Sequence, residues 1–423
     1  MGSKWEQALL GELIAAGDAV LQTGPFGTAL KAEEYTETGV PLISVREIRE
    51  GFIQLEDITP RVDSAVTARL PKFVLQEGDI VFARKGGVER NALITEREKG
   101  WFVGSDGIYL RLSKKYDAKY FSYVMRSPQV KAWLLKNCEG TTMPSLNQKI
   151  LARVPIFLPS KIQQEKIADL LFQYDEKITI NNQINQTLEK MAQTLFKSWF
   201  VDFDPVKAKM NGEQPKGMDT ATASLFPEKL VESELGLIPE GWDAVQVGDI
   251  VQRLKPKKRY TKKQVEPYGK TPVYEQGASI LLGFHNDDAG FDASPEDPVF
   301  IFGDHTCITH LSCSKFDISS NVIPLKGSVR PTIWTYYAIQ GKQEFQEYRR
   351  HWSEFIIKDV VLPPVELAEK YAELVTTKYL MMESLKRQSK ELEQLRDTLL
   401  PKLLSGEIDL ESVQVEQVKE LAE

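Results

Sequence analysis

Two stretches of the chain show the apolar spacing of long amphipathic helices. In residues 159–200 the apolar positions recur at heptad spacing, in two alternating sets: Ile167, Tyr174, Leu188 and Leu195, and Leu170, Ile184 and Met191. Residues 363–404 repeat this pattern with Tyr371, Leu385, Leu392 and Leu399, and with Leu374, Met381 and Leu395. Stripes with this period must be buried. The pattern therefore predicts two long helices that pair as a coiled coil; two independent surface helices are the alternative.

The two predicted helices belong to an internal repeat. At an offset of 204 residues and without gaps, Leu158-Pro159 matches Leu362-Pro363, and Glu165-Lys166 matches Glu369-Lys370. A second ungapped match at an offset of 237 aligns Trp5 with Trp242. A fixed internal period identifies repeated structural units. The chain is therefore expected to run domain, long helix, domain, long helix.

The repeat predicts an α+β fold: two globular α/β domains alternating with two long helices that pair as an antiparallel coiled coil, with a pseudo-two-fold internal repeat. One chain would then present two readers in opposite orientations, as split DNA sites require. The predicted segments are a first domain over 1–158, a spacer helix over 159–200, a connector over 201–240, a second domain over 241–362, a second spacer helix over 363–404 and an acidic tail over 405–423.

In the first domain, glycine-punctuated segments carry polar and basic residues. TGPFG (23–27) predicts a turn before a helical stretch, and PLISVREI (41–48) predicts a strand. GDIVFARKGGVERNALI (78–94) predicts two strands around a basic glycine loop with Arg84, Lys85, Arg90 and Asn91. These residue types grip phosphates and contact base edges. A solvated hairpin tip is the alternative interpretation.

The second domain begins with a basic run, RLKPKKRYTKK (253–263), which includes Tyr260. Cations interleaved with an aromatic residue are typical of a surface that follows phosphates; a solvated charged loop is the alternative. The segments PVYEQG, VFIFGDHTCITHLSC and SNVIPLKGSVRP predict strands joined by turns. We expect His305 and His310 to flank a DNA-facing loop.

Catalytic and metal chemistry are not expected. His305, Cys307, His310 and Cys313 are possible zinc ligands, but all four crowd one hairpin, whereas zinc sites bring paired ligands from separate elements. The sequence contains no NPPY-like or DPPY-like tetrapeptide, phosphate loop or nucleophile elbow. The chain is therefore interpreted as a binding protein.

Composition and charge limit the possible partners and the cellular environment of the protein. The 423 residues carry a net charge of −7, which argues against nucleic acid only if charge is evenly spread. Three cysteines are too few for a disulfide framework, and no apolar run is long enough to cross a bilayer. We expect a cytoplasmic protein.

The sequence resembles a known family, the specificity subunits of Type I restriction-modification systems. The resemblance covers essentially the whole chain and rests on TGPFG, GVPLISVREIREG, GDIVFARKGG, GTTMPSLNQKIL with LPSKIQQEKI, LFKSWFVDFDPVKAKMNG, LFPEKLVESELGLIPEGW and LPKLLSGEIDL. The second copy departs from the pattern, because HTCITHL stands where a basic glycine loop is typical.

The resemblance implies a non-catalytic subunit whose two target-recognition domains each read one half of a bipartite DNA site, with the helices setting the spacing. It implies two methyltransferase subunits as partners, which use S-adenosylmethionine, and restriction subunits that use ATP and Mg²⁺. No cofactor is expected on this chain itself.

The residues expected to bind DNA come from both domains: Thr23, Phe26, Arg84, Lys85, Arg90, Asn91, Lys255, Lys257, Lys258, Arg259, Tyr260 and His305. Trp199 and Phe200 are expected to anchor a partner, although they could instead close the end of the coiled coil. Two other functions remain as alternatives: a self-contained DNA methyltransferase or nuclease, and a coiled-coil scaffold without DNA.

Overall fold

The computed structural model describes residues 5–140, 142–277 and 279–410. The chain forms two compact units. The first unit comprises Met1–Ile178 and Lys390–Glu423, and the second comprises Thr179–Ser389. Because both long helices contribute one part to each unit, each unit contains a globular domain and a piece of the helix pair.

The first unit is built on a four-stranded antiparallel sheet. Its strands, in spatial order, are β2 (Ala19–Thr23), β9 (Gly107–Leu112), β6 (Ile80–Ala83) and β7 (Asn91–Leu93). All four residues of β6 are buried, as expected for the apolar run IVFA in a central strand. A separate strand pair, β1 (Glu6–Leu9) with β10 (Pro155–Leu158), leads into the first long helix.

Helices and a smaller sheet complete this unit. Side chains of Asp117, Ser127 and Asn147 cap the helices α3 (Ala118–Arg126), α4 (Pro128–Asn137) and α5 (Gln148–Ala152). Helix α1 (Leu10–Ala15) packs on α5. The smaller sheet has the order β3 (Tyr35–Thr36), β5 (Arg61–Val62), β4 (Val40–Ile43) and β8 (Phe102–Val103). Helix α2 (Ser64–Arg69) follows β5 in the chain.

The second unit repeats the main sheet of the first. Its strands β14 (Val251–Arg253), β21 (Val322–Gly327), β18 (Val299–Gly303) and β19 (Thr309–Ser312) have the same antiparallel order. The flanking elements match too: β13 (Asp243–Gln246) pairs with β22 (Asp359–Leu362), and α9 (Val247–Ile250) and α10 (Thr332–Ile339) stand in the places of α1 and α3 along the chain. The starts of β13 and β22 follow those of β1 and β10 at the sequence offsets of 237 and 204.

The second, smaller sheet is not repeated. In this unit it consists of β15 (Arg259–Tyr260), β20 (Asp317–Ser319), β16 (Thr271–Tyr274) and β17 (Leu281–His285). Strand β20 pairs in parallel with both β15 and β16, whereas in the first unit's smaller sheet β5 pairs antiparallel with both β3 and β4. The repeat therefore covers one sheet of each domain, and the other sheet differs between them.

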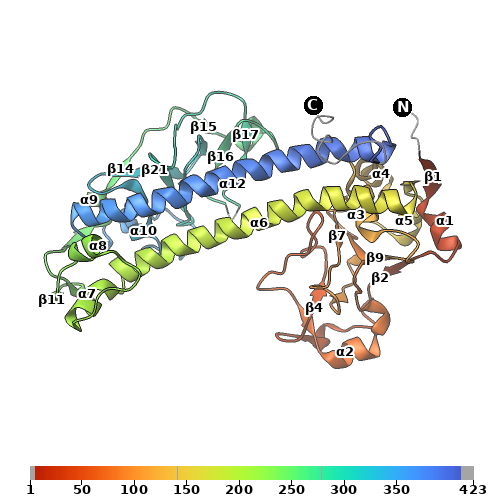
Figure 1. Cartoon of the computed structure of the whole chain (residues 1–423), viewed down its shortest axis with the longest axis horizontal. Coiled ribbons are helices and arrows are strands. Elements are labelled where there is room, and N and C mark those ends of the chain that lie inside the picture. The colour runs from red at the N-terminus through yellow and green to blue at the C-terminus, as the bar shows by residue number, and fades with distance from the viewer. Residues whose placement is uncertain (1–4, 141, 278, 411–423) are drawn as a thin grey trace. The chain divides into compact units, whose positions relative to one another are not determined.

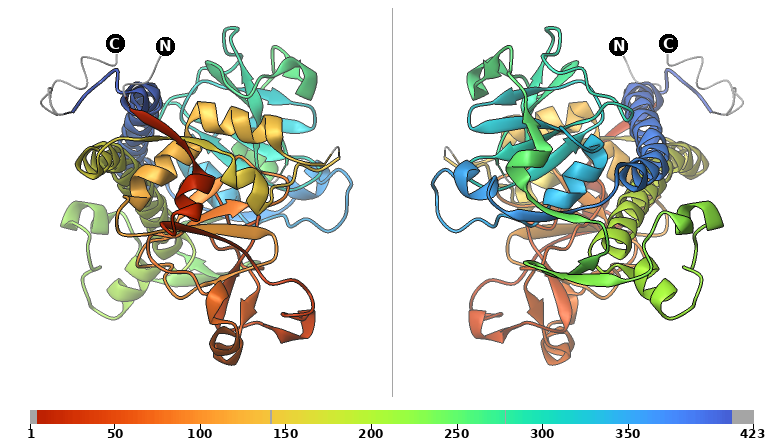
Figure 2. Two further views of the ribbon diagram at one scale, coloured as in Figure 1. Left: turned by 90° about the vertical axis from the view of Figure 1, so that its right-hand side faces the viewer. Right: turned by 90° about the vertical axis from the view of Figure 1, so that its left-hand side faces the viewer.

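The long helices α6 (Lys161–Phe200) and α12 (Val365–Ser405) pair antiparallel in each unit (Figures 1 and 2). In the first unit the start of α6 shares one apolar core with the end of α12, through residues such as Leu171 and Leu403. In the second unit the end of α6 packs on the start of α12, as with Phe196 and Tyr371. The predicted α+β fold with an antiparallel coiled coil is confirmed.

The connector after α6 folds into α7 (Asp204–Met210), α8 (Thr220–Ser224) and a hairpin of β11 (Leu230–Ser233) and β12 (Gly236–Pro239). Short elements such as α11 (Trp352–Phe355) complete the second domain. Among the residues that the structure describes, no helix is long and apolar enough to cross a membrane.

Two local predictions were wrong. The stretch after TGPFG is not an α-helix: it forms turns and a three-residue 3₁₀ helix, Ala32–Glu34. The strand expected over 41–48 ends at Ile43 because Glu47 folds back, and its carboxylate accepts a hydrogen bond from the Ser44 N–H at 3.0 Å. Most of the predicted acidic tail, from residue 411 on, lies outside the described residues.

Candidate nucleic-acid interface

Three loops of the first domain meet at one end of its main sheet. The β6–β7 loop begins at Arg84, whose N–H donates to the Asp106 carbonyl at 2.8 Å and whose carbonyl accepts from the Leu146 N–H at 2.8 Å. The Gly86 N–H donates to the Pro144 carbonyl at 2.9 Å. Main-chain bonds therefore tie the basic loop to the loop before β9 and to the 142–147 segment.

The side chains on these loops place positive charge beside an exposed aromatic ring. The Arg84 guanidinium carbon lies 5.1 Å from the centre of the Phe26 ring, and its Nη1 donates to the Ser105 carbonyl at 3.2 Å. Lys85 Nζ lies 3.0 Å from a carboxylate oxygen of Asp106, with both side chains partly exposed. A cation stacked on an aromatic face is held in one orientation and still has donors to offer.

Thr23 joins the same cluster from the end of β2. Its Oγ1 accepts a hydrogen bond from Nε2 of Gln148, at the start of α5, at 3.1 Å. The structure thus brings together four of the six candidates of the first domain: Thr23, Phe26, Arg84 and Lys85. They come from the segments TGPFG and ARKGG, which lie about 60 residues apart, and SLNQ supplies Gln148.

Arg90 and Asn91 do not belong to this surface. Arg90 is half-buried and its Nη1 donates to the Ile48 carbonyl at 3.2 Å, so it braces its own domain. Asn91 opens β7 with an exposed fraction of 0%. In this conformation its amide cannot contact DNA, because the alternating direction of strand side chains turns it into the core.

The equivalent loop of the second domain has the opposite charge. Asp304 follows β18 as Arg84 follows β6, and its N–H donates to the Asn321 carbonyl at 2.9 Å, as Arg84 does to Asp106. Its side chain is buried, and one carboxylate oxygen accepts from the N–H groups of His351 and Trp352 at 3.2 and 3.0 Å. This loop therefore organises the segment before α11 and offers no exposed cation of its own.

That segment carries the exposed cation and aromatic ring instead. Tyr348 is 72% exposed, and the Arg350 side chain is 79% exposed. The ring of His305 lies 4.8 Å from that of Tyr348, and the His305 N–H donates to Gln276 Oε1 at 3.0 Å. Tyr348 and Arg350 are not among the residues predicted from the sequence, although EYRRHW (347–352) interleaves aromatic and basic residues as the predicted run does.

The basic run itself splits into exposed and structural residues. Lys255, Lys257 and Lys258 are exposed. Arg259 is half-buried, and its Nη1 donates to the carbonyls of Ser319 and Val322 at 2.7 and 2.9 Å. Tyr260 is buried and stacks on His285 at 4.2 Å between ring centres. The lysines remain available to phosphates, whereas Arg259 and Tyr260 hold β15 in place.

The hairpin histidines and cysteines lie in different surroundings. Burial lowers the pKa of His310 to about 4 and raises the pKa of the Cys313 thiol to about 12, so both are neutral near pH 7. Cys307 lies in the turn with a positive φ of 59°. Within the described parts of the chain, no three His, Cys, Asp or Glu residues are grouped so that they could hold a metal ion.

Trp199 and Phe200 are core residues of the second unit, with exposed fractions of 4% and 5%. Their rings pack against each other and against Tyr371 of α12. The expectation that they are exposed anchors for a partner is wrong, because the aromatic positions at the end of α6 are covered by α12 and the connector.

Comparison with known proteins shows which protein family the chain resembles. Residues 4–190 match the family model of the Type I restriction modification DNA specificity domain. The chain is therefore similar to the specificity subunits of Type I restriction-modification systems. Proteins of this family are the non-catalytic, DNA-recognising components of those systems.

Relatives and a solved structure agree over most of the chain. It is 25% identical to the HindI specificity subunit of Haemophilus influenzae, over 71% of this chain and 77% of that protein. It is 22% identical to the MjaIX specificity subunit of Methanocaldococcus jannaschii, over 90% of each. Its fold is similar to the crystal structure of the S subunit from M. genitalium, with a TM-score of 0.53 and 16% identity over 95% of this chain and 96% of that one.

Proposed function

We propose that this chain is a specificity subunit of a Type I restriction-modification system and that it reads a bipartite DNA site, with one half recognised by each globular domain. The observation that carries the proposal is the repeated main sheet, which ends in each domain at a loop cluster with an exposed cation and an exposed aromatic ring. Two equivalent readers on one chain suit a site with two halves. The exposed loops grip phosphates and present a few polar side chains to base edges.

In the first domain, the reading residues are Arg84 and Lys85 with Thr23 and Phe26. Arg84 is positioned by the Phe26 ring and the Ser105 carbonyl, so little side-chain freedom is lost when it binds. The neighbouring Asp106 carboxylate competes with DNA for Lys85, and a phosphate displaces it at the cost of one partly exposed ion pair.

In the second domain, two separate surfaces contact DNA. Lys255, Lys257 and Lys258 contact phosphates, and Tyr348 with Arg350 contacts bases or sugars next to the turn that holds His305. His305 supports this surface through its contact with Tyr348. The different chemistry of the two loop clusters fits a site whose halves differ in sequence.

The helix pair sets the distance between the halves. Helix α6 has 40 residues and α12 has 41, so each is about 60 Å long at about 1.5 Å per residue. Asn181, in the middle of α6, is fully buried and donates to Gln388 Oε1 at 2.9 Å and to Ser389 Oγ at 3.2 Å. A buried polar layer of this kind favours one register of a coiled coil over its neighbours.

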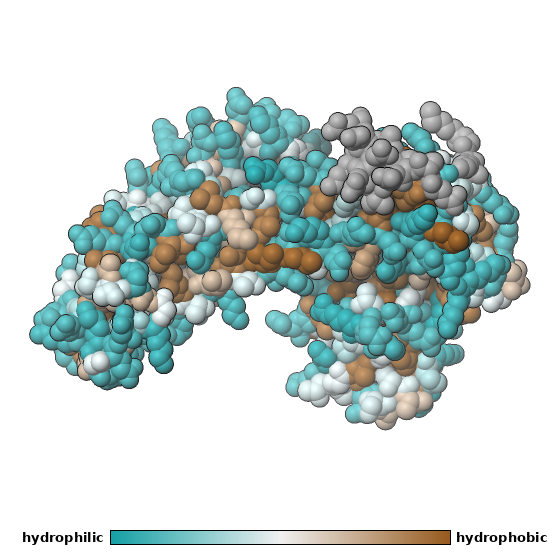
Figure 3. All heavy atoms as spheres, in the orientation of Figure 1, coloured by the Kyte–Doolittle hydropathy of each residue, from teal (hydrophilic) through white to brown (hydrophobic). Residues whose placement is uncertain are grey.

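The partners are two methyltransferase subunits, which supply S-adenosylmethionine chemistry, and restriction subunits, which supply ATP- and Mg²⁺-dependent chemistry. Figure 3 shows apolar side chains gathered along the helix pair. The exposed apolar residues of the helix pair in the second unit include Ile180, Met191, Leu380 and Met381, and the connector adds Leu235 and Leu237. Exposed apolar residues on paired helices suit a protein partner better than DNA.

The test is a methylation map of genomic DNA from cells that express this chain together with its methyltransferase subunit. The proposal predicts a two-part motif with a fixed gap that disappears when the chain is omitted. Methylation that persists without the chain, or a motif without a gap, would contradict it. Binding of S-adenosylmethionine by the isolated chain would favour a self-contained methyltransferase.

A further inference from the structure

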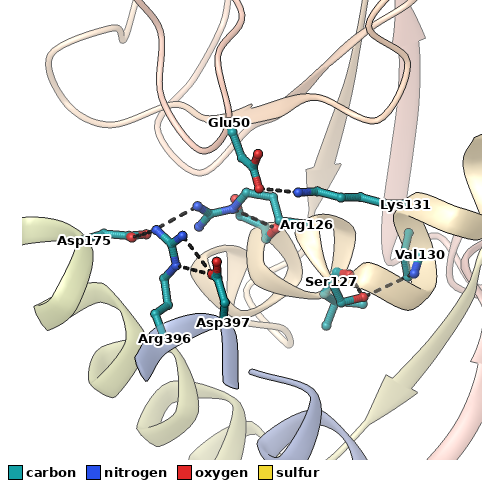
Figure 4. Close-up of polar contacts among 10 residues, drawn as sticks. Glu50, Arg126, Ser127, Val130, Lys131, Asp175, Arg396 and Asp397 are labelled. Atoms are coloured by element: carbon teal, nitrogen blue, oxygen red, sulfur yellow. Dashed lines mark hydrogen bonds and ion pairs between the residues drawn. The ribbon is translucent and has the colours of Figure 1, made fainter. Parts of the chain in front are cut away.

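Asp175 of α6 lies where the first domain meets the helix pair. Its Oδ2 accepts from the Tyr123 hydroxyl at 2.7 Å and from Arg126 Nη1 at 3.3 Å, both on α3. Its Oδ1 accepts from Arg396 Nη1 of α12 at 2.6 Å. Figure 4 shows the two arginines reaching this carboxylate from different elements. One side chain thus links the globular domain to both long helices.

We call Asp175 with Tyr123, Arg126 and Arg396 the Asp175 joint. Its central charges are largely buried, so its hydrogen-bond geometry affects its stability. The Arg126 side chain is only 9% exposed, and its guanidinium also lies over the Tyr123 ring at 4.2 Å. A cation removed from water to this extent needs a carboxylate in a fixed place. A charge-assisted bond from two directions restricts both the tilt of α3 and the register of α12 against α6.

The second unit has a joint of the same kind with different chemistry. Glu189 of α6 accepts hydrogen bonds from the hydroxyls of Tyr337 on α10 and Tyr379 on α12, each at 2.9 Å. The two hydroxyls also lie 2.7 Å from each other. Tyr379 occupies the position of Asp175 at the offset of 204. In each unit, therefore, one carboxylate of α6 connects the helix after the main sheet to α12.

We propose that Asp175 and Glu189 are positioning residues that hold each recognition domain at a fixed angle on the helix pair, and that this angle determines which gap between half-sites is accepted. The inference rests on the proposed function and deepens it. The loops would still contact the bases of each half without these carboxylates, but the two halves would no longer be required at one distance.

The test compares methylation maps for the native chain and for Asp175→Asn, each expressed with the methyltransferase subunit. Asparagine keeps the size of the side chain and an acceptor for Tyr123, but it cannot neutralise Arg126 and Arg396. The ratio of methylation at the native gap to methylation at gaps one base pair longer or shorter should fall about tenfold, the factor expected for losing a charge-assisted hydrogen bond. Asp175→Glu, which restores the charge, should recover most of the ratio.

A matched control is available on the same two helices. Asp169 of α6 lies 3.5 Å from Lys119 of α3, but both side chains are exposed. Because an exposed pair contributes little, Asp169→Asn should leave the ratio unchanged. Equal ratios for Asp175→Asn and Asp169→Asn would overturn the proposal. So would a uniform loss of methylation at every gap, which is the mark of a purely structural role.

A second variant keeps the test decisive if Asp175→Asn does not fold. Glu189→Gln keeps an acceptor for one of the two tyrosines and removes the charge of the other joint, so it should loosen the gap in the same way. An unchanged gap ratio for this variant would then overturn the proposal. Failure of the proposed function has a different signature, because the native chain itself would give no two-part motif.

Discussion

Arg84 and Asp304 begin the same loop in the two domains and have opposite charges. Arg84 remains accessible and stacks on Phe26, whereas the Asp304 carboxylate is used internally to order the segment that presents Tyr348 and Arg350. The exposed cation at this end of the sheet thus lies on one loop in the first domain and on the neighbouring segment in the second. At the residue scale, the two proposed readers are related by position and not by identity.

The lysines of the basic run should act as phosphate contacts. Lys257→Ala should weaken binding to duplexes of any sequence and reduce the slope of log K against log salt by about 0.9 for the lost contact. The measurement is fluorescence anisotropy of the complex with the methyltransferase subunit on a random-sequence duplex. Lys207→Ala, an exposed lysine on α7, is the control. An unchanged slope for Lys257→Ala would remove this lysine from the interface.

Tyr348 and Arg350 should act on one half of the site only. Truncating an exposed ring or guanidinium that contacts bases costs about 1–3 kcal/mol of discrimination at that position. Tyr348→Ala or Arg350→Ala should therefore relax one half of the methylation motif, and Arg84→Ala should relax the other half. The same half relaxing for all three variants would contradict the assignment of one reader to each domain.

The Asp175 joint should also give stability a defined pH dependence. Burial raises the pKa of Asp175, but Arg126 and Arg396 outweigh it, so the pKa lies below its ordinary value of 3.8. A lowered pKa means that the stabilisation is fully present above pH 3.8 and is lost as the pH falls through the lower folded-state value. The native chain should be more stable than Asp175→Asn by about 3 kcal/mol at pH 7, with the difference shrinking in acid. Thermal unfolding from neutral to acidic pH measures it, and a difference that stays constant would contradict the account.

Sequence could predict the exposed residues of the loops better than the residues next to them. The glycines of ARKGG mark a turn, and charged residues on turns are usually exposed, so Arg84 and Lys85 could be assigned correctly to a surface loop. Asn91 and Tyr260 are polar residues beside such loops, but each is buried by the strand it enters. Their burial depends on which neighbouring strand pairs with them, which no local pattern states.

At the element scale, the long helices were predictable because an apolar heptad stripe is typical of a helix that is buried against another helix. The predicted ranges 159–200 and 363–404 differ from α6 and α12 by no more than two residues at either end. In the main sheets, apolar runs and turns predicted β6, β7, β18, β19 and β21, but not β2, β9 and β14. In the smaller sheets they predicted only β4 and β16, because strands of two to five residues, some paired in parallel, leave little periodicity to detect.

Shortening the helix pair should shift the gap of the DNA site. Because Asn181 contacts Gln388 and Ser389, removing residues 182–185 together with residues 384–387 deletes facing turns. The lost length of about 6 Å corresponds to about two base pairs, so the gap in the methylation motif should shrink by that amount. Alanine at the same eight positions preserves the length and should preserve the gap. A deletion variant that methylates the native gap would contradict the role of the helices as a spacer.

At the scale of the whole molecule, the central claim is that each domain reads its own half independently. The strands β13 and β22 bracket the second domain just as β1 and β10 bracket the first. Each domain also has its own apolar core with a piece of the helix pair. Cores closed in this way allow one domain to be exchanged while the other stays folded.

The most direct measurement is therefore the methylation motif of a chain in which residues 247–358 are replaced by the corresponding segment of a family member with a different known motif. The account predicts that one half of the motif changes to that of the donor, while the other half remains that of the native chain. A motif in which both halves change, or neither does, would contradict the account.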